Sequence, residues 1–420
     1  MRGALRCARM LPEIYRMNRP AARRIGTMTA LSNIRIVELS GGVAGEYCGK
    51  LLADFGAEVI KVEPPQGSPV RALPPFAGND RGPDASALFA YLNTNKRSIV
   101  LDLESDGGRD ALARLVARAD VVIDDHAPGW LETVGINPDM VGASHPGLTL
   151  CTITPYGRTN AKADVPAEDL TLFHAGGWGY HTPGGVDPAK PPLKGAGRFI
   201  VSYEAGMEAA LCVSAALFDQ HRSGHGRVID ISKQRVMASR LDYVLAQMLV
   251  GDMDVTEARG AFDLGGPASI MPCADGFVYL WLSDTRMWWA MHDLMGKPDW
   301  MLEFPEDWLQ KGCTPERVAL SRQYFTQWLK TQNKHEVAAE GQKRGIMVVP
   351  INTAPDLMDS PQYQFRQFFT ELDHPVVGSA SYPTVPYRFS ATPAVLAAPA
   401  PSLGQHSKAI LDSVTQGAAQ

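Results

Sequence analysis

Short apolar runs alternate with amphipathic stretches through the first half of the chain. The first such unit predicts a strand, a glycine turn, a helix and a second strand, over 34–39, 41–45, 46–55 and 57–63. Continuous apolar runs bounded by turn residues are typical of strands that are buried on both faces. The pattern therefore predicts the beginning of a parallel sheet covered by helices.

The same alternation continues to about residue 232. Further strands are predicted over 98–103, 120–124, 148–154 and 228–231. Helices are predicted over 108–119 and 203–221, and the second of these is long and mostly apolar. Strands that alternate with helices indicate an α/β fold, here a Rossmann-like, doubly wound parallel sheet.

The pattern changes after about residue 258. Short predicted strands alternate with helical stretches, which indicates a smaller α+β domain; the strands are 270–272, 277–282 and 346–351. The predicted division is a leader over 1–29 outside the fold, a large domain over 30–232, a linker helix over 233–257, the small domain over 258–353 and a return segment over 354–420 that packs on the large domain.

The composition narrows the class of protein. The 420 residues are 45% hydrophobic and 20% charged, as expected for a globular protein with a sizeable core. The net charge is −5 and no basic block occurs after the first thirty residues, so we expect no nucleic-acid partner. No apolar run looks long enough to span a bilayer, so we expect no membrane partner.

The leader is rich in arginine and carries one acid, Glu13. It is either a transit peptide for an organelle such as the mitochondrion or a translated upstream stretch before a start at Met28, and we favour the second interpretation. The six cysteines are widely spaced and form neither a disulfide framework nor a metal-binding pattern. Such spacing indicates a reducing compartment, so we expect a cytoplasmic protein with no metal site.

The glycine turn over 41–45 is a candidate binding site for a dinucleotide cofactor. Glu63 ends the next predicted strand, near where an acid would bind a ribose hydroxyl. However, the stretch Ser40–Gly45 reads SGGVAG and does not match G-x-G-x-x-G, so a tight strand-to-helix turn is the simpler interpretation. An NAD(P)-dependent dehydrogenase stays as a remote alternative.

Cations beside predicted turns are candidates for phosphate binding. Lys96 and Arg97 follow Asn95 just before a strand, and Arg71 follows another turn. Each cation is either a phosphate ligand or part of a solvated turn. His126 follows a predicted strand at the edge where open α/β sheets bind ligands, although a single His is more often structural.

Glu168 and Asp169 form an acidic pair where a loop turns into a helix, with Gly176, Gly177 and Gly179 about two turns later. An aspartate at such a position is either a helix cap, which accepts hydrogen bonds from free backbone N–H groups, or a nucleophile. The chain has no G-x-S-x-G elbow and no H-E-x-x-H spacing, so serine hydrolase and zinc protease chemistry have no local support.

Several blocks, in one order along the chain, resemble CoA-transferase family III, also called the CaiB/BaiF family. The blocks are Leu51–Pro64, Asn95–Leu103, Ala119–Ile123, Asp169 with its downstream glycines, Arg222–Gly226, Asp275–Phe277, Pro386–Ser390 and Leu403–His406. The resemblance runs from about Leu31 to His406 and so covers nearly the whole chain. It implies a Rossmann-like domain plus a smaller domain in an interlocked homodimer.

By that resemblance, Asp169 is the nucleophile that attacks an acyl-CoA thioester. The implied intermediates are a mixed anhydride and then an aspartyl-CoA thioester, from which a free carboxylic acid takes the CoA. The implied CoA contacts are Arg71, Asn95, Lys96, Arg97, His126, Tyr156 and Gly157, and the implied substrate loop contains Gly265 and Gly266. The expected partners are an acyl-CoA, a carboxylic acid and a second copy of the chain, with CoA as a substrate and no permanently bound cofactor.

The same family includes α-methylacyl-CoA racemases, which are the nearer alternative. These enzymes use a His directly before the matching Asp, and here that position holds Glu168. A second acid, expected after Pro191–Leu193, has no clear match around Gly195–Ser202. We therefore favour CoA transfer over α-proton transfer.

Overall fold

The computed structural model describes residues 29–181, 195, 197–241, 249 and 267–416. The predicted leader and the predicted substrate loop, with Gly265 and Gly266, lie outside these residues. The chain divides into two compact units. The first comprises the chain up to Leu172 together with Ala196–Met237 and Thr370–Gln420, and the second comprises Phe173–Gly195 and Ala238–Phe369. The second unit therefore includes 354–369, which the sequence placed in the return segment.

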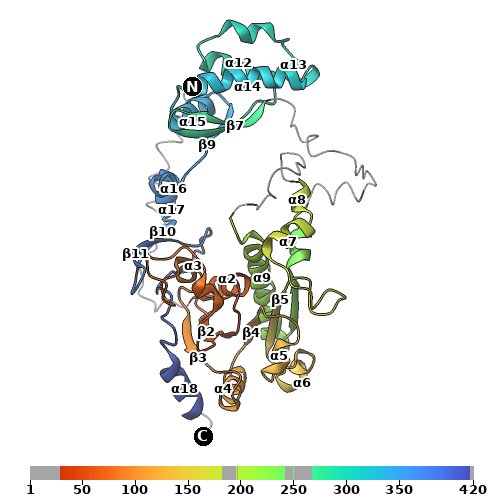
Figure 1. Ribbon diagram of the computed structural model, residues 1–420, viewed down its shortest axis with the longest axis vertical. Coiled ribbons are helices and arrows are strands. Elements are labelled where there is room, and N and C mark those ends of the chain that lie inside the picture. The colour runs from red at the N-terminus through yellow and green to blue at the C-terminus, as the bar shows by residue number, and fades with distance from the viewer. Residues whose placement is uncertain (1–28, 182–194, 196, 242–248, 250–266, 417–420) are drawn as a thin grey trace. The chain divides into compact units, whose positions relative to one another are not determined.

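The first unit is built on a six-stranded sheet (Figure 1). Its strands are β1 (Arg35–Glu38), β2 (Glu58–Glu63), β3 (Arg97–Val100), β4 (Val121–Asp124), β5 (Thr149–Thr154) and β6 (Val228–Ser232). The spatial order is β3-β2-β1-β4-β5-β6, and every neighbouring pair is parallel. The direction in which successive strands are added to the sheet reverses between β1 and β4. The predicted doubly wound parallel sheet is therefore confirmed.

Alternate residues of each strand serve two separate cores, because successive side chains of a strand point to opposite faces. Ile36 packs with α2 (Val43–Asp54) and α9 (Ile200–Ser223) on one face of the sheet. Val37 packs with α4 (Asp106–Val116) and α18 (Ser407–Gln416) on the other face. Helix α18 ends the chain yet lies beside α4 and β3, as Figure 1 shows in dark blue.

Helix α9 is 24 residues long and apolar enough to cross a membrane by length and composition. The expectation that no apolar run is long enough to span a bilayer is therefore wrong for this helix. Half of its most apolar window is nevertheless buried, through packing on α2, β5 and β6. This is the behaviour of a core helix in a doubly wound fold.

Short elements connect the sheet of the first unit. They are η1 (Pro69–Ala72), α3 (Ala87–Leu92), α5 (Trp130–Thr133), η2 (Pro138–Met140), α6 (Val141–Ser144), α7 (Asp169–Ala175), which begins in this unit, and α10 (Lys233–Ala238). Helix α8 (Trp178–His181) belongs to the second unit. The linker helix predicted over 233–257 is described only as α10, and most of its remainder lies outside the described residues. A hairpin of β10 (Phe369–His374) and β11 (Gly378–Pro383) begins the return of the chain to the first unit.

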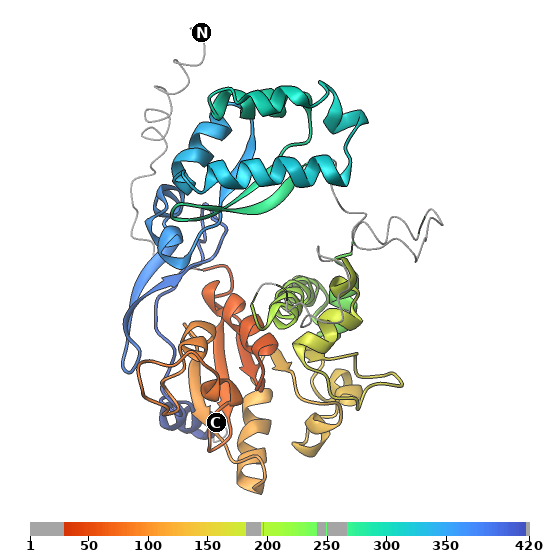
Figure 2. The same cartoon turned by 45° about the horizontal axis from the view of Figure 1, so that its top comes forward.

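The second unit contains a three-stranded antiparallel sheet in the order β7-β8-β9 (Figure 2). The strands are Ala268–Cys273, Gly276–Trp281 and Met347–Pro350. Its helices are α12 (Thr285–Leu294), η4 (Asp299–Glu303), α13 (Trp308–Lys311), α14 (Pro315–Leu329), α15 (Lys334–Lys343), α16 (Ala354–Asp359) and α17 (Pro361–Arg366). Trp288, Trp308 and Phe325 form the centre of its core, as expected for a small α+β domain.

Candidate active site

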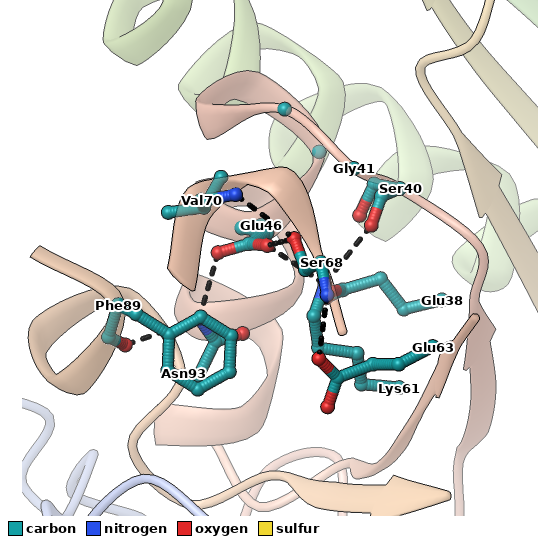
Figure 3. Close-up of polar contacts among 12 residues, drawn as sticks. Glu38, Ser40, Gly41, Glu46, Lys61, Glu63, Ser68, Val70, Phe89 and Asn93 are labelled. Carbon is teal, nitrogen blue, oxygen red and sulfur yellow. Dashed lines mark hydrogen bonds and ion pairs between the residues drawn. The ribbon is translucent and has the colours of Figure 1, made fainter. Parts of the chain in front are cut away.

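Six buried charged side chains each form an ion pair within one set, which we call the buried ionic cluster; Figure 3 shows four of them, Glu38, Glu46, Glu63 and Lys61. They are Glu38, Glu46, Glu63, Lys61, Arg71 and Lys96. Lys61 Nζ lies 3.0 Å from Glu38 Oε1 and 2.8 Å from Glu46 Oε1. Three acids and three bases balance, which is how charges are tolerated in a protein interior.

The structure gives the predicted phosphate ligand Lys96 a place in this cluster. Its Nζ lies 2.7 Å from Glu38 Oε2, 2.7 Å from the carbonyl oxygen of Glu46 and 2.9 Å from Asn93 Oδ1. An ammonium group has three donors, so all of them are used within the protein. Burial lowers the pKa of Lys96, although the charge of Glu38 opposes this effect.

Arg71 is likewise fully engaged. Its Nε and Nη2 donate to the two oxygens of Glu63 at 2.7 and 2.8 Å, and Nη1 donates to Asp84 at 2.6 Å. Its remaining N–H groups donate to the carbonyl oxygens of Pro83 and Pro401. All five guanidinium donors thus have acceptors. The geometry favours a structural role for Arg71 and Lys96 over contact with CoA phosphates.

Asn95 and Arg97 lie at the amino end of β3, opposite the edge where such sheets bind ligands. The Asn95 side chain donates to Asp54 Oδ1 and to the Val395 carbonyl oxygen, both at 2.8 Å, so it holds the return segment. Arg97 donates to Glu58 at 2.8 Å, and its side chain is 52% exposed. Neither residue is placed near the carboxyl edge of the sheet.

The glycine turn before α2 holds a carboxylate of the protein itself. Asp125 accepts hydrogen bonds from the backbone N–H groups of three glycines, at 2.9 to 3.1 Å; these are Gly41, Gly42 and Gly45. A Cβ at Gly42 would lie 2.7 Å from Asp125 Oδ2, so the turn needs glycine. A dinucleotide enzyme would bind its pyrophosphate at this helix end. Because Asp125 fills it and Glu63 pairs with Arg71, the dehydrogenase alternative loses both of its sequence features.

A cavity of about 430 Å³ lies at the carboxyl edge of the sheet. Its lining residues are Leu39, Val62, Pro64, Pro65, Gln66, Leu101, Asp102, Leu103, Glu104, His126 and Trp130. His126 Nδ1 lies 2.7 Å from Asp124 Oδ1, and its ring stacks on Trp130 with ring centroids 3.6 Å apart. Of the predicted CoA contacts, His126 alone lines this cavity, and no Lys or Arg is among its lining residues.

Tyr156 and Gly157 follow β5 at the same edge of the sheet. Gly157 has a φ of +96°, and its N–H donates to Thr154 Oγ1 at 2.9 Å. Tyr156 is partly exposed and lies beside the ammonium group of Lys162. The loop that these residues begin leads directly to Asp169.

Asp169 is the first residue of α7, and its carboxylate also meets the N-terminus of α9. The Ser202 backbone N–H donates to Asp169 Oδ2 at 2.9 Å, and the Ser202 hydroxyl donates to Oδ1 at 2.6 Å. Lys233, the residue after β6, makes a long contact of 3.5 Å from its Nζ to Ser202 Oγ. The side chain of Phe199, at the N-cap position of α9, gives no cap, so Asp169 supplies it from another part of the chain.

The partial exposure of Asp169 suits a nucleophile. Asp169 is partly exposed, whereas Ser202 is buried and fixed. The carboxylate lies at the positive end of the α9 dipole. Glu168 is exposed, and the residue of α9 that bonds Asp169 is Ser202. A racemase needs a second acid or base, and neither Glu168 nor Ser202 fills that role by the contacts described.

The sequence did not indicate Ser202, Lys233 or Trp130 as site residues. The predicted helix began at Tyr203, and a Ser just before a helix is a recognised N-terminal signal that could have drawn attention to Ser202. Among the described residues, no group of three or more His, Cys, Asp or Glu side chains is arranged to hold a metal ion.

Comparison with known proteins agrees with this fold. Residues 31–407 match the family described as CoA-transferase family III. The chain is 30% identical to the succinyl-CoA:(R)-benzylsuccinate CoA-transferase subunit BbsE of Thauera aromatica, over 90% of this chain and 93% of that protein. It is 31% identical to the succinyl-CoA–D-citramalate CoA-transferase of Chloroflexus aurantiacus, over 90% and 92% of the two chains.

A solved structure is also similar over nearly the full length. It is a CAIB/BAIF family protein from Brucella suis, with a TM-score of 0.79 and 27% identity over 92% of this chain and 99% of that chain. The chain belongs to CoA-transferase family III, which confirms the resemblance drawn from the sequence blocks. It is therefore a transferase of the class that moves CoA between an acyl-CoA and a free acid.

Proposed function

We propose that the protein transfers CoA from an acyl-CoA to a free carboxylic acid through a covalent intermediate on Asp169. The observation that carries this proposal is the contact between Asp169 and Ser202. It presents a partly exposed carboxylate in a fixed orientation at the positive end of a 24-residue helix. Such a carboxylate is oriented for attack on a thioester carbonyl.

A carboxylate suits the reaction energetically. Attack by Asp169 on the acyl carbon breaks the C–S bond, releases CoA thiolate and leaves a mixed anhydride. The thiolate then attacks Asp169 Cγ, which releases the donor acid and leaves an aspartyl-CoA thioester. An acceptor carboxylate then attacks Asp169 Cγ and releases CoA thiolate, which leaves a new mixed anhydride. The thiolate attacks the acceptor's acyl carbon, which gives the new CoA thioester and frees Asp169. Anhydride and thioester are comparably reactive, whereas a serine nucleophile would form a stable ester that does not pass CoA onward.

The nucleoside end of CoA is proposed to bind in the cavity beside His126 and Trp130. Aromatic faces suit a nucleobase, and the carboxylates of Asp102 and Glu104 suit hydroxyl and amino donors. Adjacent strands lie about 4.8 Å apart, so β4 and β6 are separated by roughly 10 Å. An extended pantetheine arm can follow the carboxyl edge past Tyr156 and Gly157 to Asp169.

Succinyl-CoA is the donor to test first, because the relatives named above carry succinyl-CoA in their names. One relative of Agrobacterium fabrum is named succinate–glutarate CoA-transferase. We therefore propose a dicarboxylic acid or a substituted succinate as the other partner. A cytoplasmic location remains our proposal on the spacing of the cysteines.

We also propose a homodimer, interlocked as the family resemblance implies. Helix α9 exposes a stripe of large apolar side chains at helical spacing, with Met207 45%, Leu211 63% and Phe218 67% exposed. An exposed apolar stripe of this kind is typical of a protein interface. Light scattering of the wild type and of a Leu211→Glu variant tests the proposal, and a monomeric wild type would contradict it.

The proposed function predicts ping-pong kinetics. Succinyl-CoA would be mixed with a panel of acids, including glutarate, citramalate and benzylsuccinate, and the new CoA thioester would be measured. Parallel lines in double-reciprocal plots, together with loss of transfer in Asp169→Asn, would support a covalent enzyme intermediate. Transfer at the wild-type rate by Asp169→Asn would overturn it.

The alternatives predict different results in the same preparation. A racemase would exchange the α-proton of a branched acyl-CoA into deuterated water without any acceptor acid. A dehydrogenase would change the fluorescence of a nicotinamide cofactor on binding. Because Asp125 fills the helix end and Ser202 bonds Asp169, we expect neither signal.

A further inference from the structure

We propose that Ser202 provides the oxyanion site for the carbonyl group of Asp169 itself. This inference rests on the proposed function and goes beyond it, because it assigns a catalytic role to a second residue. Ser202 contributes two donors, its backbone N–H and its hydroxyl. They reach different oxygens of the Asp169 carboxylate, at 2.9 and 2.6 Å.

CoA transfer through an aspartate makes the enzyme's own carboxyl carbon an electrophile. When CoA thiolate attacks Asp169 Cγ in the mixed anhydride, an S–C bond forms and the carbonyl electrons move onto the oxygen that is not part of the anhydride. The bond between Cγ and the bridging oxygen then breaks, and the donor acid leaves as a carboxylate that carries this oxygen. The negative charge passes from sulfur to the Asp169 oxygen and then to the departing acid. No proton is gained or lost.

That oxygen needs a hydrogen-bond donor already in place. The Ser202 pair covers both oxygens, so whichever one is acylated, the other keeps a donor when it becomes negatively charged. The backbone N–H also belongs to the first turn of α9, where the helix dipole stabilises negative charge. Fixed donors aimed at a developing oxyanion are among the strongest catalytic contributions.

The surroundings of Ser202 favour this role over simple capping. Its residue exposure is 3%, so its donors are held in place and are shielded from water. Lys233 Nζ lies 3.5 Å from Ser202 Oγ, which leaves the hydroxyl proton directed at Asp169. A helix cap alone would not need a second donor to reach the other oxygen of the same carboxylate.

The test separates the two kinds of chemical step. Wild type, Ser202→Ala and Ser202→Thr would each be mixed with succinyl-CoA in a single turnover and quenched with acid. Intact mass would then distinguish the succinyl anhydride from the aspartyl-CoA thioester. Attack at the succinyl carbon forms the first species, and attack at Asp169 Cγ forms the second. Thermal unfolding of each variant would show whether the fold is kept.

In Ser202→Ala, we expect conversion of the anhydride to the aspartyl-CoA thioester to slow by roughly 10- to 100-fold, since one of two donors is lost. Formation of the anhydride should slow only a few-fold, the KM for succinyl-CoA should stay unchanged, and Ser202→Thr should restore the conversion. Equal slowing of both steps, or conversion at the wild-type rate, would reduce Ser202 to a structural cap. Absence of any adduct on wild-type Asp169 would instead overturn the proposed function and this inference with it.

Discussion

The two halves of the carboxyl edge of the sheet each set an aspartate at the N-terminus of a helix, with different results. Beside β1 and β4, Asp125 receives hydrogen bonds from three backbone N–H groups of the glycine turn. Beside β5 and β6, Asp169 receives two hydrogen bonds within the described part of the chain, and both come from Ser202. Both carboxylate oxygens of Asp125 accept hydrogen bonds from backbone N–H groups, so this residue stabilises the glycine turn. Two donors leave lone pairs on the partly exposed carboxylate of Asp169 for chemistry.

The same contrast extends to the cations. On the side of β1 and β2, every donor of Arg71 and Lys96 is used inside the protein. On the side of β6, the contact of Lys233 to Ser202 is long. Fully paired charges stabilise a fold, whereas partly paired groups are typical of reaction sites. Substitutions beside β1 and β2 should therefore lower the stability of the fold, whereas substitutions beside β5 and β6 should lower the activity.

The largest expected effect is on activity, in Asp169→Asn. We expect kcat for CoA transfer to fall by about 10⁴-fold or more, since removal of a nucleophile leaves only binding effects. The free energy of unfolding should fall by only about 1 kcal/mol, the usual effect of a changed helix cap. Steady-state kinetics and urea unfolding would measure the two quantities. An inactive variant that had also lost most of its stability would contradict the separation.

Glu63→Gln should have the largest effect on stability. The change removes one of the two carboxylate partners of buried Arg71 and leaves only Asp84, so we expect the free energy of unfolding to fall by about 3 kcal/mol. If the variant folds, kcat should stay within about threefold of wild type, because Glu63 lies on the structural side. A variant with normal stability would show that the buried ionic cluster does not stabilise the fold beside β1 and β2.

The pH dependence of stability gives a second view of Glu63. Burial alone would raise its pKa, but the hydrogen bonds and charge of Arg71, with the charge of Lys61, lower it below the ordinary value of 4.5. The stabilisation is thus fully present above pH 4.5 and is lost as pH falls through the lower folded-state pKa. Urea unfolding between pH 6 and pH 3 should show a steeper decline for wild type than for Glu63→Gln. Parallel curves would rule out this contribution.

Asp125→Ala should have a smaller effect on stability. Three glycine N–H groups lose their acceptor, and water can reach some of them because Asp125 is partly exposed. We expect the free energy of unfolding to fall by about 2 kcal/mol. The variant also empties the helix end where a dinucleotide would bind. A change below about 0.5 kcal/mol would show that the turn does not depend on its carboxylate.

Glu168→Gln should have the smallest effect and is a matched control for Asp169→Asn. It changes one neighbouring acid to its amide, and Glu168 is exposed. Both kcat and the free energy of unfolding should stay close to wild type, within about 0.5 kcal/mol for the second. A large loss of kcat would indicate that Glu168 takes part in the reaction, and it would favour the racemase alternative.

The sequence predicted the sheet well because buried parallel strands are continuous apolar runs between turn residues. All six strands of the first unit and the helices α2, α4 and α9 fall within a few residues of the prediction, whereas α18 was not predicted. The β10–β11 hairpin was missed, since its Ser, Pro and Gly content looks like a loop. Short helices such as α3 and α5 were missed because four to six residues carry too little periodicity.

The site was predicted only in part, for a physical reason. Asp169 was proposed as the nucleophile from the family resemblance, since its local setting alone also fits a helix cap, and His126 was proposed from its place after a strand. Arg71 and Lys96 were proposed as phosphate ligands from their places beside turns and from the family resemblance, and their buried partners Glu63 and Glu38 lie in predicted apolar strands. Acids inside such strands need buried cations, and that signal was available in the sequence. Ser202 could not be paired with Asp169, since the contact joins residues 33 positions apart.

The most direct test of the account is to trap the covalent enzyme. Wild type, Asp169→Asn and Glu168→Gln would be incubated with succinyl-CoA, treated with hydroxylamine and mapped by peptide mass spectrometry. The account predicts a hydroxamate on Asp169 in wild type and in Glu168→Gln, and none in Asp169→Asn. A hydroxamate on another residue, or transfer of CoA with no trapped adduct in any variant, would contradict it.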